Sequence, residues 1–168
     1  MSTVDSIRDT WLVSGMKECV RLARQAVRSG NYGLGAVVLL DGEVIGSSAS
    51  SLVTGCDPTA HPEMTALREA AERVKSRYLQ GAYLVSTLEP CPMCAAAAVW
   101  AKMRGIAYGA SQLDANEWAA RHPHDTYTWR QIDLRAADVL AAGTPKLELH
   151  AEVERAACLE LFALTEAS

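Results

Sequence analysis

The feature of this sequence that most constrains its fold and chemistry is a pair of short segments, His61-Pro62-Glu63 and Pro90-Cys91-Pro92-Met93-Cys94. Together they offer one imidazole and two thiolates, which zinc prefers as ligands and which fill three of its four tetrahedral positions. A fourth position left open to water distinguishes a catalytic zinc from a structural one. We therefore expect one zinc ion per chain, with the carboxylate of the first segment close enough to move protons without binding the metal.

The local sequence suits this arrangement because a proline follows the first ligand of each segment. Proline is well tolerated in the first turn of a helix, and it disfavours helical backbone in the residue before it. His61 is therefore expected at the cap of one helix, and Cys91 at the start of another. Cys94 lies three residues further on, so both thiols project to one side and can reach the same ion. The positive end of the helix also favours their thiolate form.

Simpler interpretations of the same residues exist. A lone Cys-x-x-Cys is often a redox dithiol or half of a structural zinc site, and a histidine before a helix is often only a cap. A structural zinc would require a fourth protein ligand. The remaining candidates are Cys56, His122, His124 and His150, which the sequence does not place beside the other ligands. The presence of both segments together favours the catalytic type of site.

The composition indicates an ordinary globular protein. Of the 168 residues, 49% are hydrophobic and 21% are charged, which fits one domain, residues 1–168, with a sizeable core. The net charge of −4 argues against a surface for polyanions, so nucleic acid is not expected as a partner. The sequence shows neither a secretory signal nor an apolar run long enough to span a bilayer. With an odd number of cysteines, these features favour reduced thiols in a cytoplasmic protein without a membrane partner.

The pattern of apolar residues and turn signals predicts alternating strands and helices. A valine-rich run at 35–40 is followed by Asp41-Gly42, a strong signal for a two-residue hairpin turn, and by a return strand at 43–47. Further strands are expected at 82–86, 104–108 and 146–150, and helices at 8–28, 62–78, 92–101 and 152–164, with a mainly helical stretch at 113–140 broken near 122–124. This order predicts an α/β fold in three layers, with helices flanking a central mixed sheet.

From residue 35 to about 109 the sequence resembles the zinc-dependent cytidine and deoxycytidylate deaminase superfamily, and most closely its branch of guanine deaminases and tRNA adenosine deaminases. The matching segments are residues 35–38, 57–64 and 87–94. The resemblance implies that His61, Cys91 and Cys94 bind the zinc. It implies that Glu63 shuttles protons while water removes an exocyclic amine, as ammonia, from a small heterocycle. It also implies a cytidine-deaminase-like five-stranded sheet, and homodimers whose subunits often complete each other's active sites.

Two positions depart from the pattern of that superfamily. Pro62 stands where alanine is usual, and a first helical turn accommodates the change. Ser50 stands where these branches usually carry an asparagine that holds the substrate. The hydroxyl of serine has one donor and a shorter side chain than the amide of asparagine. Ser50 is therefore expected to form different hydrogen bonds with the edge of the substrate ring. Ala60 and Pro90, each next to a ligand, are further expected substrate contacts.

Substrate contacts outside the motifs are expected on two other segments. Trp100 resembles a tryptophan that the guanine deaminase branch places on this helix, and its alternative role is packing in the core. Residues 111–133 carry Asp114 and Glu117, whose carboxylates could accept hydrogen bonds from a ring N–H or amine. Aromatic side chains that could stack on a flat heterocycle are Trp118, Tyr127, Trp129 and Phe162. The alternative for this segment is an ordinary pair of helices with solvated charges.

The C-terminal segment bears on the choice of substrate because it is acidic. It carries Glu152, Glu154, Glu160 and Glu166 against the single cation Arg155, which repels phosphate. Guanine or a related nucleobase therefore ranks first as the substrate. Cytosine, a nucleoside or a triazine-like ring ranks second, and tRNA adenosine third. The hypothesis from a different class is a noncatalytic, zinc-stabilised dimer module.

Overall fold

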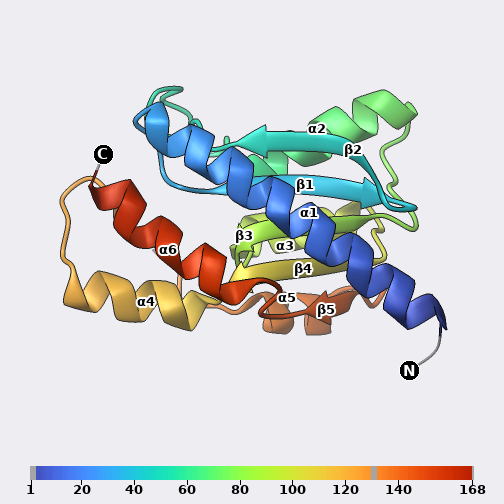
Figure 1. The fold of residues 1–168 in the computed structure, drawn as a ribbon. Helices are drawn as coiled ribbons and strands as arrows, with labels where there is room; N and C mark the ends of the chain where they lie inside the picture. Colours follow the sequence, from blue (N-terminus) through green and yellow to red (C-terminus); the bar gives the residue numbers. More distant parts are fainter. Residues whose placement is uncertain (1–2, 130–131, 168) are drawn as a thin grey trace.

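The structure is a computed structural model that describes residues 3–129 and 132–167. Its elements are α1 (Thr3–Arg28), β1 (Gly35–Leu40), β2 (Glu43–Ala49), α2 (Pro62–Val74), β3 (Tyr83–Leu88), α3 (Pro92–Trp100), β4 (Gly105–Ala110), α4 (Gln112–Arg121), α5 (Ala136–Ala142), β5 (Glu148–His150) and α6 (Arg155–Glu166). The strands form one five-stranded sheet in the order β2-β1-β3-β4-β5 (Figure 1). Strand β1 is antiparallel to β2 and β3, whereas β3, β4 and β5 are parallel. The expected central mixed sheet is confirmed.

Helices cover both faces of this sheet, which gives the three expected layers (Figure 1). Helices α1 and α6 pack on one face, and α2, α3 and α5 pack on the other. Because side chains alternate along a strand, neighbouring residues of β1 enter different cores. Val37 belongs to the cluster that contains Met16 of α1, and Val38 to the cluster that contains Ala66 of α2. Helix α4 lies beyond the sheet and contacts α6.

The local signals predict some boundaries and miss others. Asp41 and Gly42 both have positive φ and join β1 to β2 as a two-residue turn, as expected. Helix α2 ends at Val74 and not near residue 78, because Lys75 takes the left-handed conformation with φ of 55°. Its N–H then bonds back to the last turn of the helix and closes it.

The stretch at 113–140, expected to be mainly helical, is broken near 122–124 as predicted, but the break is longer than expected. Helix α4 ends at Arg121, where the following His122 precedes a proline and cannot easily remain helical. The described residues from there to Arg135, 122–129 and 132–135, are not helical. This irregular segment lies close to the functional site, as shown below. Within the described residues, no helix is both long and apolar enough to cross a membrane.

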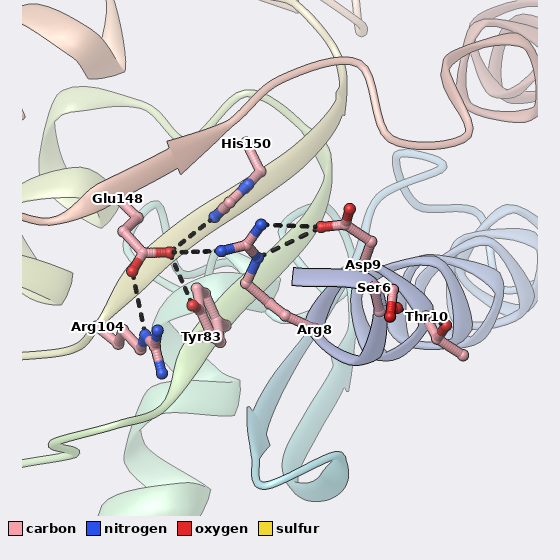
Figure 2. Close-up of polar contacts among 8 residues, drawn as sticks. All are labelled: Ser6, Arg8, Asp9, Thr10, Tyr83, Arg104, Glu148 and His150. Carbon is pink, nitrogen blue, oxygen red and sulfur yellow. Dashed lines mark hydrogen bonds and ion pairs between the residues drawn. The ribbon is translucent and has the colours of Figure 1, made fainter. Parts of the chain in front are cut away.

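The edge strand β5 is fixed by a polar cluster centred on Glu148 (Figure 2). The carboxylate of Glu148 accepts a hydrogen bond from the phenol of Tyr83 at 2.8 Å and another from Arg104 Nε at 3.1 Å. His150 Nε2 lies 3.0 Å from the same carboxylate, and Arg8 lies 3.9 Å from it. Partial burial opposes ionisation, but these hydrogen bonds hold the pKa of Glu148 at about 2. The cluster joins α1 and the last three strands at the end of β3 that is opposite to the two cysteines.

Candidate metal centre and substrate pocket

His61, Cys91 and Cys94 lie together where α2 and α3 begin. The Nδ1 of His61 is 3.6 Å from the Sγ of each cysteine, and the two sulfur atoms are 3.6 Å apart. Tetrahedral zinc, with bonds of about 2.3 Å to sulfur and about 2.0 Å to nitrogen, would place neighbouring ligand atoms roughly 3.5–3.8 Å apart. The three side chains therefore fit one zinc ion. No fourth histidine, cysteine or carboxylate among the described residues joins this group, which is the arrangement of a catalytic site.

Helix caps create this geometry. His61 and Cys91 are the N-cap residues of α2 and α3, with extended ψ of 142° and 168°, and a proline follows each at the first helical position. Hydrogen bonds from Cys94 and then from His61 lower the pKa of Cys91 to about 4 in spite of its burial. The hydrogen bond with Cys91 and burial raise the pKa of Cys94, which keeps its proton. Zinc binds both as thiolates, and its binding would release that proton.

Glu63 lies beside the three ligands without joining them. It is buried in the first turn of α2, and burial raises its pKa. Its Oε1 accepts a hydrogen bond from the hydroxyl of Ser86 at 2.8 Å, and its Oε2 lies 3.8 Å from the Sγ of Cys94. A buried carboxyl with a raised pKa, next to a metal position, is suited to taking up and returning a proton.

A pocket of about 570 Å³ opens at these residues, within the usual size range of small-molecule sites. Most of its lining is apolar or aromatic: Tyr32, Leu34, Leu52, Val53, Pro58, Leu88, Met93, Trp129 and Ile132. Its polar lining is Cys56, Asp57, His61, Glu63, Glu89, Cys91 and Thr128. Among the described residues that line the pocket there are carboxylates but neither a lysine nor an arginine.

Ser50, Ala60 and Pro90 lie next in sequence or space to this pocket but do not line it. The backbone N–H of Ser50 donates to the carbonyl of Leu34, which does line it. Ser50 is 3% exposed, and its Oγ has no hydrogen-bond partner among the described residues. An unpaired buried hydroxyl costs free energy, so this oxygen is available to a ligand or water.

The structure does not bring Trp100 to the pocket. It is the last residue of α3, whereas Cys91 precedes the first, and a helix advances about 1.5 Å per residue. The side chain is 82% exposed, so the alternative of core packing is also wrong.

Asp114 also serves another role than the one expected. With Ser111 it forms a capping box at the start of α4, and it pairs with Arg155 of α6. The Ser-x-x-Asp spacing is a known helix-start signal and could have been recognised in the sequence. Glu117 pairs with Arg121 on the surface of the same helix.

Glu89 was assigned no role from the sequence, but it lines the pocket and is only 1% exposed. Its carboxylate accepts hydrogen bonds from Arg135 Nε at 2.9 Å, from Gln112 N at 2.8 Å and from Ala136 N at 2.9 Å. Burial disfavours its charge, but the hydrogen bond from Arg135 and those from the two backbone amides lower its pKa. One carboxylate thus ties the cysteine loop to the starts of α4 and α5. An acidic residue next to an apolar strand was the available signal, since buried charges need partners.

Comparison with known proteins gives one family match and relatives that include two kinds of deaminase. Residues 9–110 match the family described as the cytidine and deoxycytidylate deaminase zinc-binding region. The chain is 36% identical over 124 residues to a guanine deaminase of Bacillus subtilis, covering 73% of this chain and 78% of that protein. It is 38% identical over 95 residues to a tRNA-specific adenosine deaminase of Aquifex aeolicus, covering 56% and 63%. It is 45% identical over 105 residues to a tRNA(Ile)-lysidine synthase of Deinococcus radiodurans, of which the chain spans only 18%.

Solved structures agree with these matches. A structure from a study of tRNA A34 deaminases superposes with a TM-score of 0.70 at 28% identity, covering 88% of this chain and 98% of that one. A guanine deaminase from Nitrosomonas europaea superposes with a TM-score of 0.77 at 20% identity, covering 93% and 85%, and supports the fold alone. The family match, the relatives and the three convergent ligands lead to one conclusion. This chain belongs to the zinc-dependent cytidine and deoxycytidylate deaminase family and is a hydrolytic deaminase.

Proposed function

We propose that this deaminase acts on a small heterocyclic amine without a phosphate group, and that guanine or a related nucleobase is its substrate. The observation that carries this proposal is the lining of the pocket beside His61, Cys91 and Cys94. Apolar and aromatic side chains enclose it, which suits a flat ring. Its described charged groups, Asp57, Glu63 and Glu89, are acidic, which disfavours a nucleotide or nucleic acid.

The proton chemistry falls to Glu63. A zinc ion held by His61, Cys91 and Cys94 would supply a water whose pKa is lowered to about 7. Ser86 holds Oε1 of Glu63, and Oε2, the oxygen nearer Cys94, would be the one to take up a proton from such a water. As the water oxygen bonds to the amine-bearing ring carbon, the same carboxyl would deliver protons to the ring nitrogen and to the amine. The C–N bond then breaks, ammonia leaves and the ring carbon becomes a carbonyl. Such general acid–base catalysis is typically worth about 10²–10⁴-fold in rate.

Guanine ranks before the other bases for two reasons. The match to the Bacillus subtilis guanine deaminase covers most of both chains. A purine with several N–H donors also suits a pocket whose described acidic groups, Asp57, Glu63 and Glu89, can accept hydrogen bonds. Cytosine, a nucleoside or a triazine-like ring is the second candidate class. Deamination of tRNA adenosine is a further candidate, favoured specifically by the similarity to the Aquifex aeolicus enzyme.

Ammonia release by the zinc-loaded protein tests these candidates directly. The panel contains guanine, cytosine, adenosine, cytidine, a triazine and unmodified tRNA, with the Glu63→Ala variant as the control. We expect release from guanine or a related base that the variant lacks. Release from tRNA alone, with RNA binding that weakens steeply as salt rises, would instead support the tRNA reaction. Absence of release by both the variant and the wild type would instead support the noncatalytic zinc module.

We also propose that the chain is one domain, works in the cytoplasm and forms a homodimer. All five cysteines are free thiols, which suits a reducing compartment. Helix α3 carries no charged residue, yet its last residue, Trp100, is 82% exposed. A helix that is apolar on all sides is normally buried, so a second subunit is the natural cover. Sedimentation should show a dimer that Trp100→Ser dissociates and that Leu164→Ser, a change at an exposed leucine of α6, leaves intact.

A further inference from the structure

We propose that Glu166, the last residue of α6, is a positioning residue that holds Trp129 as a wall of the substrate pocket. The tightness with which the heterocycle binds would then depend on a carboxylate in the C-terminal helix. This inference rests on the proposed function of the pocket, because it assigns the wall against which the ring lies.

The contact between the two side chains is direct. The indole Nε1 of Trp129 donates a hydrogen bond to Oε1 of Glu166 at 3.0 Å. The indole Nε1 of Trp118 donates to the same oxygen at 2.8 Å. Hydrogen bonds to a carboxylate are stronger than those between neutral groups, so one oxygen orients two tryptophans. Only Trp129 of the two lines the pocket, which makes Trp118 a natural reference for the structural part of the effect.

Two aromatic neighbours, one earlier and one later in the sequence, hold the ring of Trp129 in place. It meets Tyr32 with ring centroids 5.4 Å apart and Phe162 with centroids 4.5 Å apart, both nearly perpendicular, a preferred geometry for aromatic pairs. Tyr32, which also lines the pocket, donates its hydroxyl to the carbonyl of Thr126 and accepts from the N–H of Thr128. The irregular segment that carries Trp129 is therefore attached to the α1–β1 connection and to α6.

The backbone of Trp129 is strained. Its φ is +36°, in the left-handed region that bulky residues rarely adopt. Such a conformation costs on the order of 1–3 kcal/mol and persists only where surrounding contacts impose it, typically at functional sites. Here the imposing contacts are those of Glu166, Tyr32 and Phe162. They place the ring in the pocket lining, where its side chain remains only 8% exposed.

Binding of 8-azaguanine, followed by tryptophan fluorescence of the zinc-loaded protein, tests this placement. We expect a ligand-dependent change that Trp129→Phe abolishes and that the matched variant Trp118→Phe retains. We expect Glu166→Ala to weaken 8-azaguanine roughly tenfold, as loss of a hydrogen bond to a charged group implies, and Glu166→Gln to weaken it less. With the base that the wild type turns over fastest, Glu166→Ala should raise KM by a similar factor and change kcat less than twofold.

Other outcomes would overturn the proposal. These are a wild type whose fluorescence does not respond to 8-azaguanine, a response that survives in Trp129→Phe, or unchanged binding in both Glu166 variants. An equal loss of binding in Trp118→Phe would show a general structural role instead. If Glu166→Ala does not fold, Glu166→Gln and Trp129→Phe still decide the question. Failure of the proposed function is distinguishable, because the ammonia panel would then show no release from guanine or a related base.

Discussion

The hydroxyl of Ser86 donates a hydrogen bond to Oε1 of Glu63 across 2.8 Å, and both side chains are buried. Ser86 lies in the central strand β3, where it pairs with Ala36 of β1 and with Tyr108 of β4. The central strand of the sheet, paired on both sides, thus orients the carboxyl that we assign to proton transfer. Support of this kind keeps a reacting group in the productive geometry.

Replacement of Ser86 by alanine should therefore lower activity without loss of metal. Removing one hydrogen bond to a buried carboxyl costs about 1–2 kcal/mol, so kcat should fall roughly 5- to 30-fold. Glu63→Gln should lose the larger factor of about 10²–10⁴. Thr87→Val is the matched control, because it removes a buried hydroxyl from the adjacent residue, which faces the other side of the sheet. Equal kcat values for Ser86→Ala and the control would contradict the assignment.

The zinc content should depend on the three ligands His61, Cys91 and Cys94 and on no other cysteine. We expect one zinc per chain in the wild type. Cys94→Ser should weaken zinc binding at least about 100-fold, since changes even to residues behind the ligands cost 10- to 100-fold. Cys56→Ser, at a cysteine that lines the pocket outside the ligand group, should leave the zinc content unchanged. Elemental analysis after dialysis measures this, and a metal loss in Cys56→Ser would show a different ligand set.

The metal centre and the sheet were predictable because their signals are local. A proline after His61 and after Cys91 specifies a helix cap, and Asp41-Gly42 specifies a hairpin turn. The walls of the pocket were predictable only in part, because Trp129 was among the aromatic residues expected to stack on the ring but Tyr32 was not. The rings of Tyr32 and Trp129 are in contact there although the two residues are far apart in the sequence. No spacing in the sequence encodes that contact.

The misplaced residues show the same limit. Trp100 was assigned by resemblance, but its distance from the pocket is set by the length of α3. Asp114 was expected to contact the substrate, and Glu89 was given no role. The residue in the variable segment caps a helix, whereas the residue in the motif ties three elements together below the pocket. Burial and long-range partners decide between such roles, and they require the fold.

Glu89 should accordingly be one of the most sensitive positions for stability. Glu89→Ala removes a carboxylate that is 1% exposed and leaves Arg135 and two helix-start amides without their acceptor. Loss of one partner of a buried ion pair costs about 3–5 kcal/mol. Glu160→Ala breaks the pair of Glu160 with Arg24, in which both side chains are largely exposed, and should cost at most about 1 kcal/mol. Urea unfolding measures both, and similar losses would mean that Glu89 does not hold the three elements.

Glu148 should make stability depend on acid pH, because its pKa of about 2 in the folded protein is well below the ordinary value of 4.5. A carboxyl with a lowered pKa contributes stability that is present above the unfolded pKa and is lost as pH falls toward the folded one. The free energy of unfolding of Glu148→Gln should therefore lie below that of the wild type at pH 7. The difference should shrink progressively below about pH 4.5.

Tyr83→Phe provides the matched variant for this measurement, because it removes one of the hydrogen bonds that Glu148 accepts and leaves the carboxyl in place. The pKa of Glu148 should then rise toward its ordinary value, so this variant should lose stability over a narrower acid range than the wild type. Urea unfolding at a series of pH values from 7 to 3 gives both curves. A gap between the wild type and Glu148→Gln that stays constant over that series would show that the hydrogen bonds around β5 do not stabilise the charged form.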